Sequence, residues 1–238
     1  MRRHYKILLV SLGALLVLSG CYQQPGLVED TSYNRTKTGV ALGALTGAVI
    51  GYNSGKHRSK DAVIGGLLGA AVGGAIGYSL DEQANEVARA LGTHVNNDPL
   101  AALDPNNDIV VSKHPYYVKI MFRDRMMFAT DSAELQPSAK RKVLKLAQLL
   151  KRYPQTIVGV AGFTDDRGSF EYNLRLSERR ALAVARLLTV NGRRPYVKGC
   201  SKLKPLVPNT NARNRALNRR VEVYLFADPN HMVDPCKA

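Results

Sequence analysis

Hydrophobic and polar positions follow two regular patterns along the C-terminal half of the chain. Short runs rich in β-branched and aromatic residues predict strands over Tyr116–Phe122, Thr156–Ala161, Tyr196–Gly199 and Arg220–Phe226. Apolar residues at helical spacing predict helices over Pro137–Arg152, Glu178–Leu188 and Asn209–Asn218. Strands that alternate with helices predict an α/β fold, a two-layer sandwich with a mixed sheet and helices on one face.

Glycine recurs at every fourth position in two arms, Gly39–Gly55 and Gly65–Gly77, with the polar stretch Asn53–Asp61 as the turn between them. Glycine costs about 1 kcal/mol against alanine in a helix in water, so this spacing is typical of helices that approach closely. We therefore expect a helical hairpin over residues 38–78 that resembles a glycine zipper. The pattern leaves open an in-membrane hairpin, an oligomerising helical pair and a tightly packed soluble hairpin.

A basic start followed by a short apolar run predicts an export signal over residues 1–20. The run Ile7–Val17 is too short for a spanning helix, and it leads into Leu18–Cys21, which resembles a bacterial lipobox. That resemblance implies cleavage before Cys21, lipidation of this residue, and a lipid anchor in the outer membrane. An ordinary signal peptide with an incidental cysteine is the alternative. The polar residues 21–37 then form a tether.

The stretch before the α/β domain divides into a helix and a linker. Apolar residues on one side predict a helix over Ser79–Gly92, and asparagine and proline predict a linker over His94–Lys113. We therefore expect helix and linker over residues 79–113, the folded domain over 114–228, and a C-terminal tail over 229–238.

Two cysteines remain once Cys21 is set aside. Cys200 and Cys236 form an even pair, as expected for an exported protein in an oxidising compartment. The sequence leaves open whether they form a disulfide that pins the tail or two free thiols.

Charge and residue types narrow the class of function. The formal net charge of +15 indicates an anionic environment, which nucleic acid, anionic lipid or cell-wall polymer would supply. The export signal and the lack of aromatic residues interleaved with the arginines argue against nucleic acid. No histidine lies beside a plausible nucleophile or in metal-ligand spacing, and no nucleotide-binding loop occurs. We therefore expect no enzyme, no cofactor and no metal.

A strand, a turn and a helix bring together one acid and one arginine. Asp165 follows the strand Thr156–Ala161, and Ser177 is expected to cap a helix with Arg180 in its first turn. An acid beside a cationic helix start suits a zwitterion, since the acid can take an ammonium and the arginine a carboxylate.

The same residues resemble the signature of OmpA-like peptidoglycan-binding domains. The match runs from Thr164-Asp165 through Leu176-Ser177 and Arg180-Ala181 to Leu188, and Phe128–Leu135 and Asn218–Val223 match flanking segments of the family. It covers about Tyr116–Phe226. The resemblance implies the OmpA-like sandwich, with Asp165 holding the ammonium and Arg180 the carboxylate of meso-diaminopimelate in the peptidoglycan stem.

Four further residues are candidates by the same resemblance. Thr164 and Asn173 match positions that support the ligand or the loop, and Asp131 matches a polar position that lines the pocket. Arg219 or Arg220 adds a second cation; adjacent strand residues point to opposite faces, so only one can serve, and Arg220 is preferred. The structural alternatives are that Asp165 caps its own turn and that Arg180 is a solvated helix arginine.

Together these observations predict a non-enzymatic outer-membrane lipoprotein that binds peptidoglycan non-covalently and tethers the membrane to the wall. The glycine-zipper segment would serve self-association or contact with other envelope proteins. The alternative function is a wall-anchored component of a cell-envelope secretion or assembly machine that oligomerises through the zipper.

Overall fold

The computed structural model describes residues 79–237. The expected export signal, lipidated Cys21, tether and glycine zipper lie outside the described residues.

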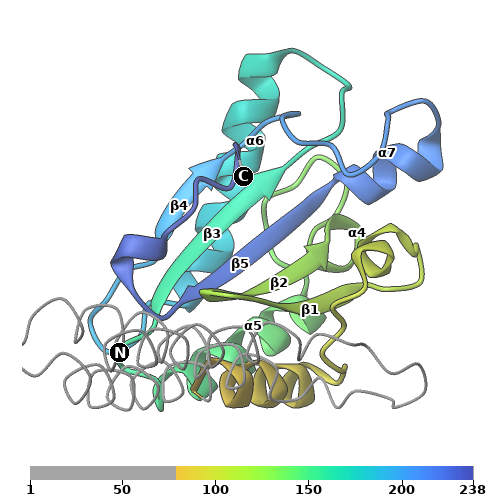
Figure 1. The fold of residues 1–238 in the computed structure, drawn as a ribbon. Helices are drawn as coiled ribbons and strands as arrows, with labels where there is room; N and C mark the ends of the chain where they lie inside the picture. Colours follow the sequence, from red (N-terminus) through yellow and green to blue (C-terminus); the bar gives the residue numbers. More distant parts are fainter. Residues whose placement is uncertain (1–78, 238) are drawn as a thin grey trace, which may run out of the picture. The chain divides into compact units, whose positions relative to one another are not determined.

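The sheet has five strands: β1 (Ile109–His114), β2 (Tyr117–Arg123), β3 (Ile157–Phe163), β4 (Tyr196–Gly199) and β5 (Arg220–Phe226). The spatial order is β1-β2-β5-β3-β4, with β3 and β4 parallel and the other neighbours antiparallel. The helices are α4 (Asp124–Met127), α5 (Pro137–Leu150), α6 (Phe170–Leu187) and α7 (Ala212–Asn218), with 3₁₀ turns η2 (Pro99–Leu103) and η3 (Pro229–His231). The predicted α/β class and mixed sheet are confirmed (Figure 1).

The two faces of the sheet are covered differently. Alternate residues of the strands, such as Ile120, Val160 and Val223, join α5 and α6 in the main apolar core. On the other face, a smaller buried cluster that includes Phe163 and Phe226 packs against Met232 and Val233 of the C-terminal segment. The long helices therefore lie on one face, as expected, and the tail covers part of the other.

The tail is held by a disulfide. Cys200 and Cys236, which the sequence left open as a bond or two thiols, are joined with an S–S distance of 2.02 Å. Lys198 Nζ on β4 adds an ion pair of 2.7 Å to Asp234. The tail is thus fixed at the C-terminal end of β4, where the next residue but one, Ser201, accepts from the N–H of Thr164 beside the Asp165 loop.

The linker expected over His94–Lys113 is wrong, and so is a domain start at residue 114. Residues 109–113 belong to β1, which pairs along its whole length with β2. Residues 79–91 are helical, and Leu80, Val87 and Leu91 are buried in the main core. The polar residues that suggested a linker are used in turns: Asp98 caps η2, and Asn97 accepts from the backbone of Lys113.

The predicted start of the long helix at Glu178 is also wrong. The cap of α6 is Ser169, whose hydroxyl accepts from the N–H of Tyr172, so the helix begins at Phe170. Ser177 is buried inside the helix and accepts from the backbone N–H of Ser201 at 3.1 Å. Arg180 therefore lies in the middle of α6, far from the helix dipole's positive end.

Two glycines let α6 lie directly against the ends of β3 and β4. A Cβ atom on Gly162 would lie 2.1 Å from the carbonyl oxygen of Ser177, and one on Gly199 would lie 2.8 Å from that of Leu174. Since real Cβ contacts are never this short, any side chain here would push the helix off the sheet. This close approach positions Arg180 beside the loop after β3.

The core role of residues 79–91 predicts that Leu91→Ala lowers the free energy of unfolding by about 2–5 kcal/mol, because it leaves a cavity. Urea unfolding measures this, with Leu100→Ala as the matched control because Leu100 is 65% exposed. Equal stability of the two variants would mean that the helix is an appendage rather than part of the core.

The disulfide predicts a second stability effect. Cys236→Ser is expected to cost about 2–4 kcal/mol, because the bond constrains the unfolded chain. Thermal unfolding with and without reductant measures it, and reduction should bring the wild type down to the variant. Cys21→Ser serves as the control and should leave the transition of residues 79–237 unchanged.

Candidate functional site

Two carboxylates and two guanidinium groups form one chain of ion pairs where β3 ends. Arg219 Nη1 donates to Asp165 Oδ2 at 2.6 Å, and Arg219 Nε lies 3.8 Å from Asp124 Oδ2. The other oxygen of Asp124 lies 2.8 Å from Arg180 Nη1. The order is therefore Asp165, Arg219, Asp124, Arg180, which we call the ion-pair chain. Charges alternate along it, so each group has a partner of opposite sign, as buried charges require.

The four members differ in exposure. The side chains of Arg180, Asp165 and Asp124 are 4%, 9% and 11% exposed, whereas that of Arg219 is 34% exposed. Arg219 is thus the member of the chain that meets solvent. Arg219 lies between Asp165 and solvent, because it donates a hydrogen bond to one oxygen of that carboxylate.

Burial acts against the charges of Asp124 and Arg180. It raises the pKa of Asp124 above its ordinary value, although Arg180 and Arg219 oppose that rise. It lowers the pKa of Arg180, although Asp124 opposes the fall. With Arg180 and Asp124 2.8 Å apart, we take both as ionised, each holding the other's charge in place.

Arg180 is also fixed from two other directions. Its Nε donates to the carbonyl of Ser132 at 2.9 Å, and its guanidinium lies 5.1 Å from the ring centroid of Phe128. Both contacts come from the segment between α4 and α5, which matches a flanking segment of the expected family. The alternative of a solvated helix arginine is therefore wrong for Arg180, whereas its neighbour Arg179 is exposed.

The Asp165 loop is held by the residues that were expected to support it. Thr164 Oγ1 donates to the Asp165 carbonyl at 3.0 Å, and Asn173 Nδ2 donates to the Arg167 carbonyl at 2.8 Å. Asp165 itself accepts from the Arg167 N–H through Oδ1 at 3.1 Å, so it does cap its own turn. Its second oxygen is the one that Arg219 holds. Thr164 and Asn173 thus fix the loop through its backbone.

Asp131 lies at the edge of the site. It is exposed and has a left-handed backbone, with φ of 55°. Its negative charge adds to the rise in the pKa of Asp124 and opposes the fall in the pKa of Arg180. No direct bond joins it to the ion-pair chain among the described residues.

The sequence favoured Arg220 over Arg219 as the second cation of the site, and the geometry shows the reverse. Arg220 shares the sheet face of Glu222 and pairs with it at 2.7 Å, and its guanidinium lies 3.8 Å from the ring centroid of Phe163. That face points away from α6 and Arg180, because strand side chains alternate. Arg219, the residue before β5, turns toward Asp165 instead.

Asp124 was missed altogether by the sequence analysis. It begins the short helix α4, and the motif of the family does not include it. For Arg219 a signal did exist. Arg220 and Glu222 are two apart in a strand and so share a face, and a glutamate buried there needs the nearer arginine as its partner. Because Arg220 is taken by Glu222, Arg219 is the arginine left to face α6 and the Asp165 loop.

Residues 79–237 contain no cluster of three or more histidine, cysteine or acidic side chains arranged to hold a metal ion. Nor does any helix in this range combine the length and apolarity that crossing a bilayer requires.

Comparison with known proteins gives two family matches on separate parts of the chain. The model of the YMGG-like Gly-zipper family matches residues 1–81, and that of the OmpA family matches residues 127–219. The second match includes three of the four members of the ion-pair chain, Asp165, Arg180 and Arg219, but not Asp124.

Three individual proteins illustrate the similarity. The peptidoglycan-associated lipoprotein of Pseudomonas aeruginosa is 33% identical over 135 residues, which cover 56% of this chain and 80% of that protein. The probable lipoprotein YiaD of Escherichia coli is 37% identical over 105 residues, 43% of this chain and 48% of that protein. The chain thus spans about half the length of YiaD. The solved cell wall anchor of the T6SS from Pseudomonas aeruginosa is 30% identical with a TM-score of 0.49, covering 61% of this chain and 99% of that one.

The ion-pair chain predicts how Asp124 titrates. Arg219→Gln is expected to raise the pKa of Asp124 further, because Arg219 now lowers it. Folding already raises this pKa, so the Asp124 carboxyl favours the folded state at acid pH and loses that contribution as pH rises. The variant should therefore lose more stability than the wild type between acid and neutral pH. Carboxyl ¹³C NMR gives the pKa directly. The exposed Arg213→Gln is the control, and identical Asp124 titration in both variants would contradict the coupling.

Proposed function

Because the chain belongs to the OmpA family, we propose that residues 79–237 bind peptidoglycan and that the ion-pair chain holds the diaminopimelate of the peptide stem. One observation carries the proposal. Asp165 and Arg180 come from different elements, yet one chain of ion pairs contains both, with two further charges between them. A group of this kind offers carboxylates for an ammonium and guanidinium groups for a carboxylate.

Binding would proceed by exchange of partners. The free centre of meso-diaminopimelate carries one ammonium and one carboxylate on the same carbon. In our proposal the ammonium replaces Arg219 on Asp165, where Arg219 is the exposed member and the easiest to displace. Arg219 and Arg180 then share the carboxylates of Asp124 and the ligand. Every charge keeps a partner of opposite sign in both states, so neither state leaves a buried charge unpaired.

The exchange also accounts for specificity. A stem residue that lacks the free carboxylate, such as lysine, would displace Arg219 without giving it a new partner. The site would then hold an extra positive charge that nothing compensates. Diaminopimelate satisfies both ends, so we expect it to be preferred over lysine.

At the level of the whole chain we propose a wall tether. Lipidated Cys21 would hold the outer membrane while residues 79–237, on the periplasmic side, hold the wall, with the zipper segment available for self-association. The chain is a binding protein and not an enzyme, as its relatives are named as lipoproteins and outer-membrane proteins. The role of a component in a larger secretion or assembly machine stays a prediction.

The test is co-sedimentation of the full chain with insoluble peptidoglycan. Asp165→Asn and Arg180→Ala should each weaken binding by about thirtyfold or more, because losing one partner of a buried charge pair costs about 2–5 kcal/mol. The matched controls are the exposed neighbours, Asp166→Asn and Arg179→Ala, which should bind as the wild type does.

Two further arms test the ligand. Free meso-diaminopimelate should displace the wild type, and peptidoglycan with lysine in the stem should bind more weakly. Melting curves identify any variant that fails to fold. Wild-type binding by folded Asp165→Asn would contradict the assignment of the site, and wild-type binding to lysine-containing wall would contradict the diaminopimelate specificity alone.

A further inference from the structure

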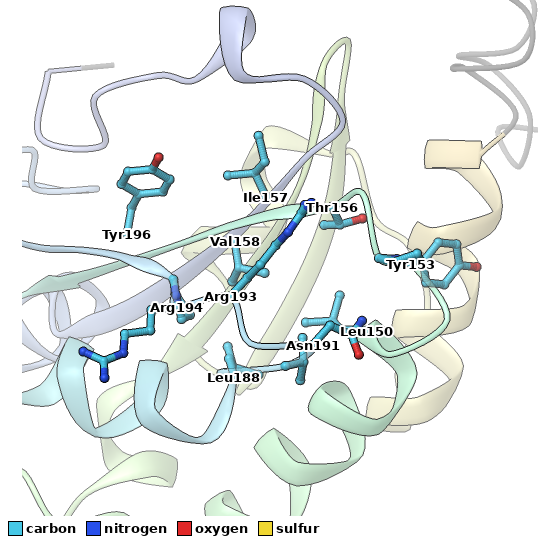
Figure 2. Close-up of a pocket in the computed structure, with 13 residues that line it drawn as sticks. Leu150, Tyr153, Thr156, Ile157, Val158, Leu188, Asn191, Arg193, Arg194 and Tyr196 are labelled. Carbon is cyan, nitrogen blue, oxygen red and sulfur yellow. The ribbon is translucent and has the colours of Figure 1, made fainter.

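A groove of about 340 Å³ opens at the end of the sheet where β3 begins. It is lined by the end of α5, the start of β3 and the turn that leads into β4 (Figure 2). Its apolar lining consists mainly of Leu150, Ile157, Val158, Leu188 and Val190. Arg193 and Arg194 lie on its rim and are exposed, and so is Tyr196 at 63%.

The groove is apolar inside and positive at the rim. None of its lining residues is acidic. The neighbouring Lys151 adds positive charge. The charge of Arg152 is compensated by Glu86, which also accepts from the hydroxyl of Tyr153. Over a wider range, residues 135–164 and 179–221 contain no aspartate or glutamate at all. A ligand that complements this groove has an anionic group attached to an apolar body.

The groove is separate from the ion-pair chain. Thr156, on its rim, precedes β3, whereas Asp165 follows the other end of the same strand. At about 3.3 Å per strand residue, the two sites lie roughly 25–30 Å apart. One ligand of the size of a stem peptide's terminal residue does not reach both.

The chain enters the domain beside the groove. Gln83 Nε2 in the helical residues 79–91 donates to Thr156 Oγ1 at 2.8 Å, and Glu86 accepts from Tyr153 at 2.7 Å. Thr156 and Tyr153 both line the groove. The end of the domain that receives the preceding chain, and through it the proposed anchor at Cys21, is thus the end that carries the groove.

We propose that this groove binds an anionic phospholipid, with the headgroup phosphate on the guanidinium of Arg193, whose side chain runs toward Thr156 (Figure 2), and the start of an acyl chain on the apolar lining. Arg194 points to the other side and adds positive charge at the rim. Guanidinium groups pair with phosphate through two parallel hydrogen bonds. The choice of a membrane lipid over other anionic amphiphiles rests on the proposed tether function, in which the lipid anchor belongs to the chain that enters the domain at this end. The domain would then touch membrane at one end of β3 and wall at the other.

The test is flotation of the full chain, carrying Cys21→Ser in every sample, with vesicles of phosphatidylcholine alone or mixed with phosphatidylglycerol. For each variant we compare flotation with and without phosphatidylglycerol. Because every variant carries the same N-terminal segment, binding by that segment contributes equally to all of them. Arg193→Glu with Arg194→Glu should reduce the preference for phosphatidylglycerol by at least about tenfold. The matched control is Lys140→Glu with Arg141→Glu, the same charge change at the far end of α5, which should retain it.

Soluble competitors separate a lipid from a free anion. Short-chain phosphatidylglycerol should displace the protein from vesicles, whereas inorganic phosphate and glycerol phosphate at equal concentration should not, because they lack the apolar part. Equal flotation of the groove variant and the control overturns the proposal, and so does displacement by inorganic phosphate. The groove variant should still sediment with peptidoglycan, so this result is independent of the wall-binding test.

Discussion

Buried charge must be paired, and this requirement organises the end of the domain that carries the site. Asp165, Arg219, Asp124 and Arg180 come from four segments that are far apart in sequence, and only the folded sheet brings them into one alternating series. Removing Arg219 leaves the buried Asp165 without its ion-pair partner, and removing Asp124 does the same to the buried Arg180. In the proposed exchange, a ligand that supplies both signs of charge opens the series and leaves no charge without a partner.

The geometry that supports the series depends on backbone contacts rather than on side-chain packing alone. Gly162 and Gly199 let α6 lie against β3 and β4, which brings Arg180 within reach of Asp124. Thr164 binds the Ser201 carbonyl through its own N–H, and Ser201 follows the disulfide-bonded Cys200. The disulfide, α6 and the Asp165 loop are thus connected through the backbone of Ser201, although the cysteines lie outside the ion-pair chain.

The sequence was sufficient to predict the α/β class, four of the five strands, and that the fold brings Asp165 and Arg180 together. It was insufficient where tertiary contacts override local signals. β1 is polar enough to resemble a linker because it is an edge strand, and Ser177 resembles a helix cap although its hydroxyl bonds across to Ser201. Asp124 carries no local signal, because its role exists only once Arg180 and Arg219 lie on either side of it.

The exchange of ion-pair partners is tested most directly by NMR titration of the protein with a soluble stem peptide that ends in meso-diaminopimelate. The resonances to follow are the Nε–H groups of Arg180 and Arg219 and the carboxyl carbon of Asp165. Exchange predicts that all three shift together and saturate at one ligand concentration. Saturable binding that leaves Arg219 and Asp165 unshifted would show that their pair stays closed, and would contradict the exchange.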